Sequence, residues 1–381
     1  MVKKGILLVV CIVLVLALVS AFACSQPTAP ATTQAPAPTT KAPASAPQKV
    51  IEWKLQSAFA RVGGFGMITM PRFIENIDKK TNGKLKITYY DQNALVGANE
   101  IFGAVSKGAI EMGSAVGSYH AGTLPEGNFE YGLPMNVESQ RQGYDLYLNY
   151  KGGEIHKILS EAYAKFNIKL LNYNFFDNAL MTKNPIKSVA DLKGLKVRAV
   201  GLAGQLMINV GASGISVPNA EIYTSLERGT CDALIMAPYS LKTQNYAEVV
   251  HYLYYPILFA SPASYFVNMD AYKALPDEYK KILEDEIAYA SLGTYLDGKD
   301  LPKVYIDSKD PVGNFEEREA GLVDIAVKAG KVTKGTLTPE MVKALRDGAK
   351  PIWDDYAAKS PTLARLVQLN RDYIAEKGLF K

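Results

Sequence analysis

The sequence predicts an α/β fold with two lobes. In two stretches, residues 50–116 and 168–236, strand-like and helix-like segments alternate. Such alternation is typical of a mostly parallel sheet covered by helices. About 330 residues follow an N-terminal leader, which is enough for two domains or for one large bilobal body.

Residues 1–23 have the pattern of a secretory signal peptide. Two early lysines precede an apolar core at residues 6–18, and Ala21-Phe22-Ala23 forms a small-residue cleavage site. The apolar run is shorter than a membrane span requires. Cys24 follows at once and resembles the lipid-modified first residue of a bacterial lipoprotein, although Ala21 stands where that pattern usually has Leu. Cleavage by the general signal peptidase, without a lipid, is the alternative.

Residues 24–49 are expected to form a disordered tether. Six prolines lie among Ala, Thr and Gln, with no acidic or aromatic residue, so the segment cannot bury enough apolar surface to fold. The net charge of the chain is +4, and residues 1–49 contain four lysines and no acid. Subtracting those four charges leaves residues 50–381 with a net charge of zero. The charge therefore gives no argument for a nucleic acid partner.

The first set of elements ends in a loop with two candidate lining residues. Apolar spacing predicts a strand at 50–55, a helix at 67–77, a strand at 85–89, a helix at 101–105 and a strand at 110–116. Tyr119 and His120 follow the third strand. Ligands of open α/β sheets bind beyond the carboxyl ends of strands, so both side chains are candidates. A surface loop histidine is the alternative for His120.

Arg198 is the candidate binding residue with the clearest local pattern. Val189 and Leu192 are spaced for a one-turn helix, and Gly194 allows a tight turn. Residues 195–199 then alternate apolar and basic side chains, as a half-buried strand does. Arg198 is expected on the polar side of that strand, where a guanidinium can hold a carboxylate through two parallel hydrogen bonds. A surface arginine in a salt bridge is the alternative.

The other elements of the second set surround this strand. They are a strand at 168–176, a helix at 202–210, a short strand at 216–218, a helix at 221–228 and a strand at 231–236. Beyond them, residues 251–259 are apolar and aromatic, residues 265–268 are strand-like, and Pro276 opens a long helix. The tail from about residue 300 is expected to be helical, with Trp353 and Leu366 as packing contacts.

Few residues suit an enzyme or a disulfide. Cys231 is the only cysteine after residue 24, so no disulfide can form within the domain, and we interpret it as a buried structural thiol. The chain has only three histidines, His120, His156 and His251. It contains no Gly-x-Ser-x-Gly elbow, cysteine pair or HExxH motif. An enzyme is therefore disfavoured.

A series of short motifs runs through residues 51–300 in a characteristic order. Those of the first half are residues 80–83, 104–108 and 111–113 and Pro134. Those of the second half are Asp191 to Arg198, Val210-Gly211-Ala212, Val217-Pro218, residues 221–229, Asp232-Ala233, Phe266-Val267-Asn268 and Leu275-Pro276. Together they resemble the solute receptors of TRAP transporters, the tripartite ATP-independent periplasmic family.

This resemblance implies a two-lobed periplasmic binding protein fold with mixed, mostly parallel sheets. Connecting strands would be shared between the lobes, and a long helix would span both. Lobe I would comprise residues 50–174 and 258–300, and lobe II residues 175–257 and 301–381. Such lobes close around a ligand by hinge bending.

The resemblance also implies site residues. The arginine that grips the ligand carboxylate matches Arg198, and Tyr119 matches a loop tyrosine of the branch that binds 2-oxo and 2-hydroxy acids. The chain departs from that branch at its metal site, because Ile235 stands in place of a metal-binding Glu and residues 257–260 contain no second acid. Isoleucine cannot ligate Ca²⁺ or Na⁺, which require oxygen. No metal or other cofactor is therefore expected.

The branch that binds sialic acid is also a poor match, since Asn178 and Met236 replace its Arg and Asn. What remains is one strong cation, a few polar groups and an apolar or aromatic wall. The candidate ligand-binding residues are Arg198, Asn178, Tyr119, Met236, Phe59, Ile235 and Tyr239. They predict a monocarboxylate with an apolar or aromatic body. Core packing is the alternative for each aromatic side chain.

The function implied is that of a receptor outside the cytoplasm. It would capture an organic acid by hinge closure and deliver it to the TRAP membrane subunits. Membrane contact is expected only through a lipid on Cys24. The alternatives are an ABC-type substrate-binding protein, the ligand-binding partner of a two-component sensor and, with least support, a secreted enzyme.

Overall fold

The computed structural model describes residues 49–59, 70–217, 219–292 and 315–380. The predicted signal peptide, Cys24 and the tether up to residue 48 lie outside these residues. Within the part that is described, no helix is both long enough and apolar enough to cross a membrane.

Nine strands of the described residues form one continuous mixed sheet. They are β1 (Ile51–Ser57), β2 (Leu85–Tyr90), β3 (Met112–Ala115), β4 (Ile168–Thr182), β5 (Lys196–Arg198), β6 (Ser213–Ile215), β7 (Ala233–Met236), β8 (Tyr252–Asn268) and β9 (Thr333–Thr336). Their order is β2-β1-β3-β8-β4-β7-β5-β6, with β9 beside β8. Antiparallel pairing occurs where β8 joins β3 and β4 and where β4 joins β7, and the other pairs are parallel. The predicted mixed α/β sheet is confirmed.

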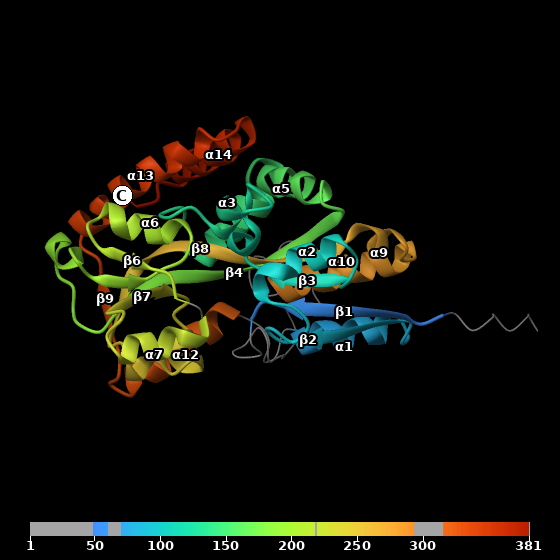
Figure 1. Ribbon diagram of the computed structural model, residues 1–381, viewed down its shortest axis with the longest axis horizontal. Coiled ribbons are helices and arrows are strands. Elements are labelled where there is room, and N and C mark those ends of the chain that lie inside the picture. Colours follow the sequence, from blue (N-terminus) through green and yellow to red (C-terminus); the bar gives the residue numbers. More distant parts are fainter. Residues whose placement is uncertain (1–48, 60–69, 218, 293–314, 381) are drawn as a thin grey trace, which may run out of the picture. The chain divides into compact units, whose positions relative to one another are not determined.

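The two long strands, β4 and β8, lie next to each other in the middle of the sheet (Figure 1). They pair from Ile168 with Asn268 to Thr182 with Tyr252. β3 joins the C-terminal part of β8, and β7 joins the C-terminal part of β4. Both halves of the sheet therefore share these strands. Two separate segments were predicted at 251–259 and 265–268, but the structure joins them in one strand through Pro262, although proline lacks the N–H of a ladder and usually interrupts strands.

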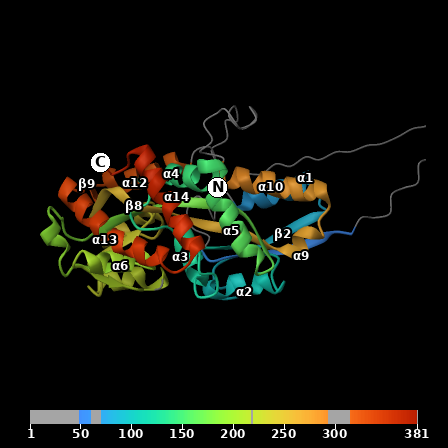
Figure 2. The same ribbon diagram turned by 90° about the horizontal axis from the view of Figure 1, so that it is seen from above.

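Helices cover the sheet. The α-helices are α1 (Met70–Lys80), α2 (Ile101–Ser106), α3 (Gly127–Tyr131), α4 (Gln140–Tyr144), α5 (Glu154–Ala164), α6 (Leu202–Asn209), α7 (Ile222–Glu227), α8 (Ser240–Thr243), α9 (Met269–Lys273), α10 (Asp277–Leu292), α12 (Phe315–Lys328), α13 (Pro339–Ala357) and α14 (Pro361–Lys377). Short 3-10 or π turns are η2 (Ala98–Glu100), η3 (Gly117–His120), η4 (Asp145–Asn149), η5 (Tyr150–Gly152), η6 (Val189–Leu192), η7 (Asn219–Glu221) and η8 (Tyr246–Glu248). Helix α1 buries Phe73 and Ile77 and packs beside α10 (Figure 2).

The tail reaches elements of both predicted lobes. Helix α13 packs on α6 and α14, whereas α14 packs on α5 and α3 (Figures 1 and 2). Trp353 and Leu366 are buried in the larger apolar cluster, as predicted. The tail is therefore not confined to predicted lobe II, and the lobe boundaries stay a prediction. The long helix predicted to open at Pro276 is α10, and the expectation that a long helix spans both lobes stays a prediction.

Asn268 ties the end of β8 to two helices. Its Oδ1 accepts hydrogen bonds from the backbone N–H groups of Asp270 (3.1 Å) and Ala271 (3.0 Å) and so caps α9. Its Nδ2 donates to the backbone oxygen of Val105 in α2 at 2.9 Å. The motif Phe266-Val267-Asn268 therefore ends in a structural residue.

We expect Asn268→Ala to lower the free energy of unfolding by about 2 kcal/mol, because a helix cap and a buried hydrogen bond are both lost. Urea denaturation followed by circular dichroism measures this change. Asn149→Ala removes an exposed asparagine and should change stability by less than about 0.5 kcal/mol. Equal midpoints and slopes for Asn268→Ala and the unmodified protein would contradict the assignment.

Candidate functional site

A one-turn helix and a glycine turn set the start of β5. The Asp191 carboxylate accepts hydrogen bonds from the backbone N–H groups of Lys187 (2.8 Å) and Ser188 (2.9 Å) and from the Ser188 hydroxyl. These bonds hold the pKa of Asp191 below its usual value, and the bond from the Lys187 backbone has the largest effect. Gly194 has φ +72°, which a side chain would strain. The predicted turn of helix, glycine turn and strand are confirmed.

Arg198 is buried rather than exposed at the end of β5, with 5% of its surface accessible. Its Nε and Nη2 donate to the backbone oxygen of Val217 at 3.1 and 3.0 Å, and Nη2 also donates to Asn219 Oδ1 at 3.0 Å. Among the described residues, no carboxylate lies within ion-pair distance of this guanidinium. The surface salt bridge considered for Arg198 is therefore wrong. A strand was predicted at 216–218, but β6 lies earlier, at Ser213–Ile215, and Val217 instead supplies the carbonyl that orients Arg198.

Three tyrosines lie within range of the Arg198 charge. Tyr119 is in η3, Tyr131 ends α3 and Tyr246 begins η8. Burial raises the pKa of Tyr131 and of Tyr246 to about 12 and also raises the pKa of Tyr119, while the Arg198 charge acts in the opposite direction on all three. All three phenols are therefore neutral at pH 7 and can donate hydrogen bonds. The sequence offers no local signal for Tyr131 or Tyr246, because neither lies in a recognisable motif.

The loop after β5 lies against η3 and α3. Gly201 precedes α6 with φ +58° and ψ −140°. A Cβ at this position would lie 3.7 Å from the Tyr131 ring, 3.8 Å from Asn128 Oδ1 and 3.9 Å from Ser118 Cβ. Elements that follow β3 and an element that follows β5 therefore meet near Arg198.

Asn178 belongs to the polar groups where β4 crosses β8. Only 2% of its surface is accessible, and its Nδ2 donates to the Ser261 hydroxyl at 2.7 Å. Ser261 also hydrogen-bonds the Tyr131 side chain. Asn178 is thus linked through one hydroxyl to a tyrosine beside Arg198.

Met236 and Ile235 lie on opposite faces of the sheet. Arg198 pairs directly with Leu234 in the ladder between β5 and β7. Directly paired residues share a face and successive residues of a strand alternate, so Met236 shares the Arg198 face and Ile235 does not. Met236 is half-buried, whereas Ile235 is 4% exposed and packs in the larger apolar cluster.

The other sequence candidates have different surroundings. Phe59 is half-buried and meets Phe176 edge to face, with ring centroids 6.4 Å apart. Tyr239 is half-buried immediately before α8. His120 is buried, 5% exposed, and stacks on Phe102 at 4.4 Å. The surface histidine considered for His120 is therefore wrong.

The expectation that no metal takes part in binding stays a prediction. Ile235 offers no oxygen at the position of the expected acid and points away from the Arg198 face. In the ranges that the structure covers, no group of three or more His, Cys, Asp or Glu side chains could hold a metal ion. The chemistry available near Arg198 is a cation, three phenols and an apolar thioether.

Known proteins share this chain's sequence pattern and fold. Residues 67–295 match the family model described as bacterial extracellular solute-binding protein, family 7. The chain is 30% identical over 250 residues to a monocarboxylate 2-oxoacid-binding periplasmic protein of Nostoc, a match that covers 64% of this chain and 66% of that protein. It is 26% identical over 228 residues to a 2,3-diketo-L-gulonate-binding periplasmic protein of Escherichia coli, covering 57% and 66% of the two chains.

Solved structures are similar in fold. A TRAP periplasmic solute-binding protein from Pseudoalteromonas atlantica, with bound sodium and pyruvate, has a TM-score of 0.70 at 24% identity and covers 86% of this chain and 95% of its own. A TRAP transporter solute-binding protein from Bordetella bronchiseptica, with copurified calcium and picolinate, has a TM-score of 0.69 at 22% identity, with coverages of 87% and 93%. At these identities the likeness concerns the fold.

Cys231, which lies just before β7, provides a test of the packing around that strand. The thiol is buried, and burial raises its pKa, with a smaller effect in the same direction from Asp232. We therefore expect Cys231 to remain unmodified by Ellman's reagent at pH 8 in folded protein that lacks residues 1–24, and to react after unfolding in urea. A Cys231→Ser variant gives the background. Rapid modification of the folded protein would show that the thiol is accessible.

Proposed function

Because the chain belongs to the family 7 bacterial extracellular solute-binding proteins, we propose that it is the solute receptor of a TRAP transporter and binds an organic acid at Arg198. The family description places its members outside the cytoplasm. The observation that carries the proposal is the buried Arg198 guanidinium, which meets no carboxylate among the described residues. A buried cation without an anionic partner is costly, and a ligand carboxylate removes that cost on binding.

The contacts of Arg198 define how an acid would bind. Nε and Nη2 both donate to the Val217 carbonyl, which fixes the plane of the guanidinium. Nη1 makes no hydrogen bond to the described residues. A ligand carboxylate would bind Nη1 and the open side of Nη2, and the neutral hydroxyls of Tyr119 and Tyr131 would donate to its oxygens.

The proposed ligand is a monocarboxylate with an apolar or aromatic body. Its carboxylate would face Arg198, and Met236, on the same face of the sheet, would contact its apolar part. Phe59 and Tyr239 would supply further wall, and Asn178 would act through Ser261 and Tyr131. Ile235 would support the strand from the opposite face. The Nostoc relative, named as a monocarboxylate 2-oxoacid-binding protein, agrees with a single carboxylate.

Capture would proceed by closure of the two lobes. The shared strands β4 and β8 would bend, bringing Tyr119 and Tyr131 towards Arg198, and the closed receptor would deliver the acid to the TRAP membrane subunits. A lipid on Cys24 and the tether would hold the receptor at the membrane. The family match gives no support to a secreted enzyme, and no observation favours the ABC-type or sensor-partner alternatives.

Replacing the proposed carboxylate-binding residue tests the site directly. We expect Arg198→Ala to weaken binding of 4-methyl-2-oxopentanoate by at least about tenfold, roughly 1.4 kcal/mol, because the charge-assisted pair is lost. Isothermal titration calorimetry measures the affinity. Arg228→Ala, which removes an exposed arginine at the end of α7, is the matched control and should bind normally. Unchanged affinity in Arg198→Ala would remove Arg198 from the site.

A panel of acids tests the ligand class. We expect 4-methyl-2-oxopentanoate and phenylpyruvate to raise the unfolding temperature more than equal concentrations of pyruvate or lactate, because at equal concentration the ligand with the higher affinity for the folded state stabilises it more. Addition of EDTA should leave these shifts unchanged, since no metal bridge is proposed. Stabilisation by pyruvate or lactate but not by the larger acids would refute the apolar body, and loss of the shifts in EDTA would refute metal-free binding.

A further inference from the structure

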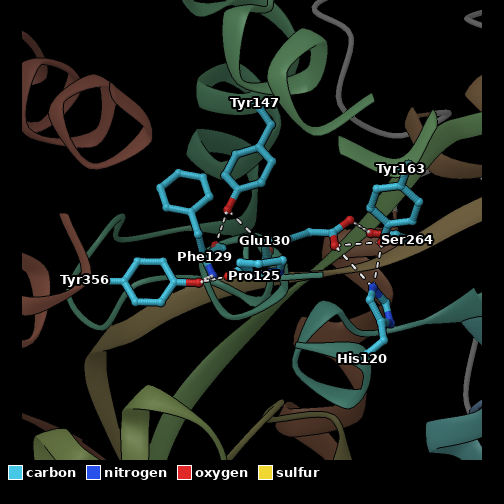
Figure 3. Close-up of polar contacts among 8 residues, drawn as sticks. All are labelled: His120, Pro125, Phe129, Glu130, Tyr147, Tyr163, Ser264 and Tyr356. Atoms are coloured by element: carbon cyan, nitrogen blue, oxygen red, sulfur yellow. Dashed lines mark hydrogen bonds and ion pairs between the residues drawn. The ribbon is translucent and has the colours of Figure 1, made fainter. Parts of the chain in front are cut away.

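A fully buried carboxyl group, Glu130, lies directly beside the tyrosine that ends α3. The Tyr163 hydroxyl donates to Glu130 Oε2 at 2.7 Å, and the Ser264 hydroxyl donates to Oε1. His120 Nε2 lies 3.7 Å from Oε2 (Figure 3). These four residues, the Glu130 cluster, join α3, α5, β8 and η3.

The hydrogen bonds of the cluster have one consistent direction. Tyr163 has a single hydroxyl proton, which it gives to Glu130. At 2.9 Å from His120 Nε2 it therefore accepts, so the histidine proton lies on Nε2. Among the described residues, no Lys or Arg lies within ion-pair distance of Glu130. Burying a carboxyl group without a Lys or Arg partner costs free energy. We therefore attribute to Glu130 a role in fixing the local geometry rather than in stabilising the core.

The cluster holds two elements that touch through their backbones. A Cβ on Gly117 would lie 2.3 Å from the Gly127 oxygen, and a Cβ on Gly127 would lie 2.4 Å from the Gly117 oxygen. η3 and α3 therefore pack without intervening side chains. Each carries a tyrosine next to a cluster member: Tyr119 precedes His120, and Tyr131 follows Glu130.

Helix α3 depends on neighbours for its place. It has five residues, too few for a helix that is stable alone. From η4, the Tyr147 hydroxyl donates to the backbone oxygens of Phe129 (3.0 Å) and Glu130 (3.3 Å). From α13, the Tyr356 hydroxyl donates to the backbone oxygen of Pro125 and accepts from the Phe129 N–H at 3.3 Å (Figure 3). Glu130 connects α3 to α5 and β8 through the hydrogen bonds that it accepts from Tyr163 and Ser264.

We propose that Glu130 is a positioning residue of the ligand site. Its carboxyl group fixes α3 and η3 so that the hydroxyls of Tyr131 and Tyr119 meet an acid bound at Arg198. Glu130 itself makes no ligand contact. The proposal rests on the proposed function, because it requires an acid at Arg198.

Two substitutions separate shape from hydrogen bonding. Glu130→Gln keeps the volume and a polar head to which the hydroxyls of Tyr163 and Ser264 can readjust, so it should bind within about threefold of the unmodified protein. Glu130→Leu removes every acceptor and should weaken binding about tenfold. Glu126→Gln, a buried carboxyl group just before α3 and outside the cluster, is the matched control and should bind normally. Calorimetry with 4-methyl-2-oxopentanoate, and with pyruvate in parallel, gives the affinities.

A double-mutant cycle distinguishes positioning from general support of the fold. If Glu130 acts through the Tyr131 hydroxyl, Glu130→Leu should cost less than about threefold in a Tyr131→Phe background. Equal losses in both backgrounds, or normal affinity in Glu130→Leu, would overturn the proposal. If Glu130→Leu does not fold, Tyr163→Phe, which removes one donor to Glu130, takes its place in the same cycle with the same criteria. If the unmodified protein binds neither acid, the proposed function fails; if it binds and only the cycle is additive, the positioning role alone fails.

Discussion

Backbone hydrogen bonds between β4 and β8 connect the two halves of the sheet. No other pair of described strands links β1, β2 and β3 to β5, β6 and β7. β1, β2 and β3 reach the rest of the sheet through β8, and β5, β6 and β7 reach it through β4. The register shifts at Leu170/Asn172 and Asn178/Leu180 are places where this ladder departs from regular pairing. Any relative movement of the half-sheets would have to bend these two strands, and the hydrogen-bonded pair Asn178–Ser261 lies beside the second register shift.

The proposed binding residues come from both half-sheets. Arg198 comes from the half that contains β5 and is oriented by a carbonyl of its own side, Val217. Tyr119 and Tyr131 come from the half that contains β3. A ligand carboxylate that joins the cation to the phenols would therefore contribute its binding energy only when both halves are close. In the proposed mechanism, this arrangement would couple capture to closure, since a ligand can shift an equilibrium only by its differential affinity for the two states.

Local patterns could predict the elements around Arg198 but not the residues that surround its side chain. The capping contacts of Asp191, the left-handed Gly194 and the alternation in β5 all depend on residues within a stretch of twelve. Local sequence patterns are therefore enough to indicate the turn and the strand. Tyr131, Tyr246 and Glu130 reach the site through α3 and η8, whose places depend on contacts with distant helices. The face of Ile235 followed from a strand register that the sequence alone does not specify. The continuity of β8 was hidden by its prolines, because local propensity argues against them inside a strand.

The pairing of β3 with β8 has a consequence for how the chain is made. The edge of residues 112–115 is covered only after residues 264–267 have been synthesised. In contrast, β4 is synthesised before its partner β7. The half-sheet that comes first in the chain thus stays open until β8 is made. While about 150 further residues are made, β3 has an unpaired edge, and such edges pair readily with foreign strands. A chain made from its N-terminus therefore has this edge open to pairing with other strands until β8 is available to cover it.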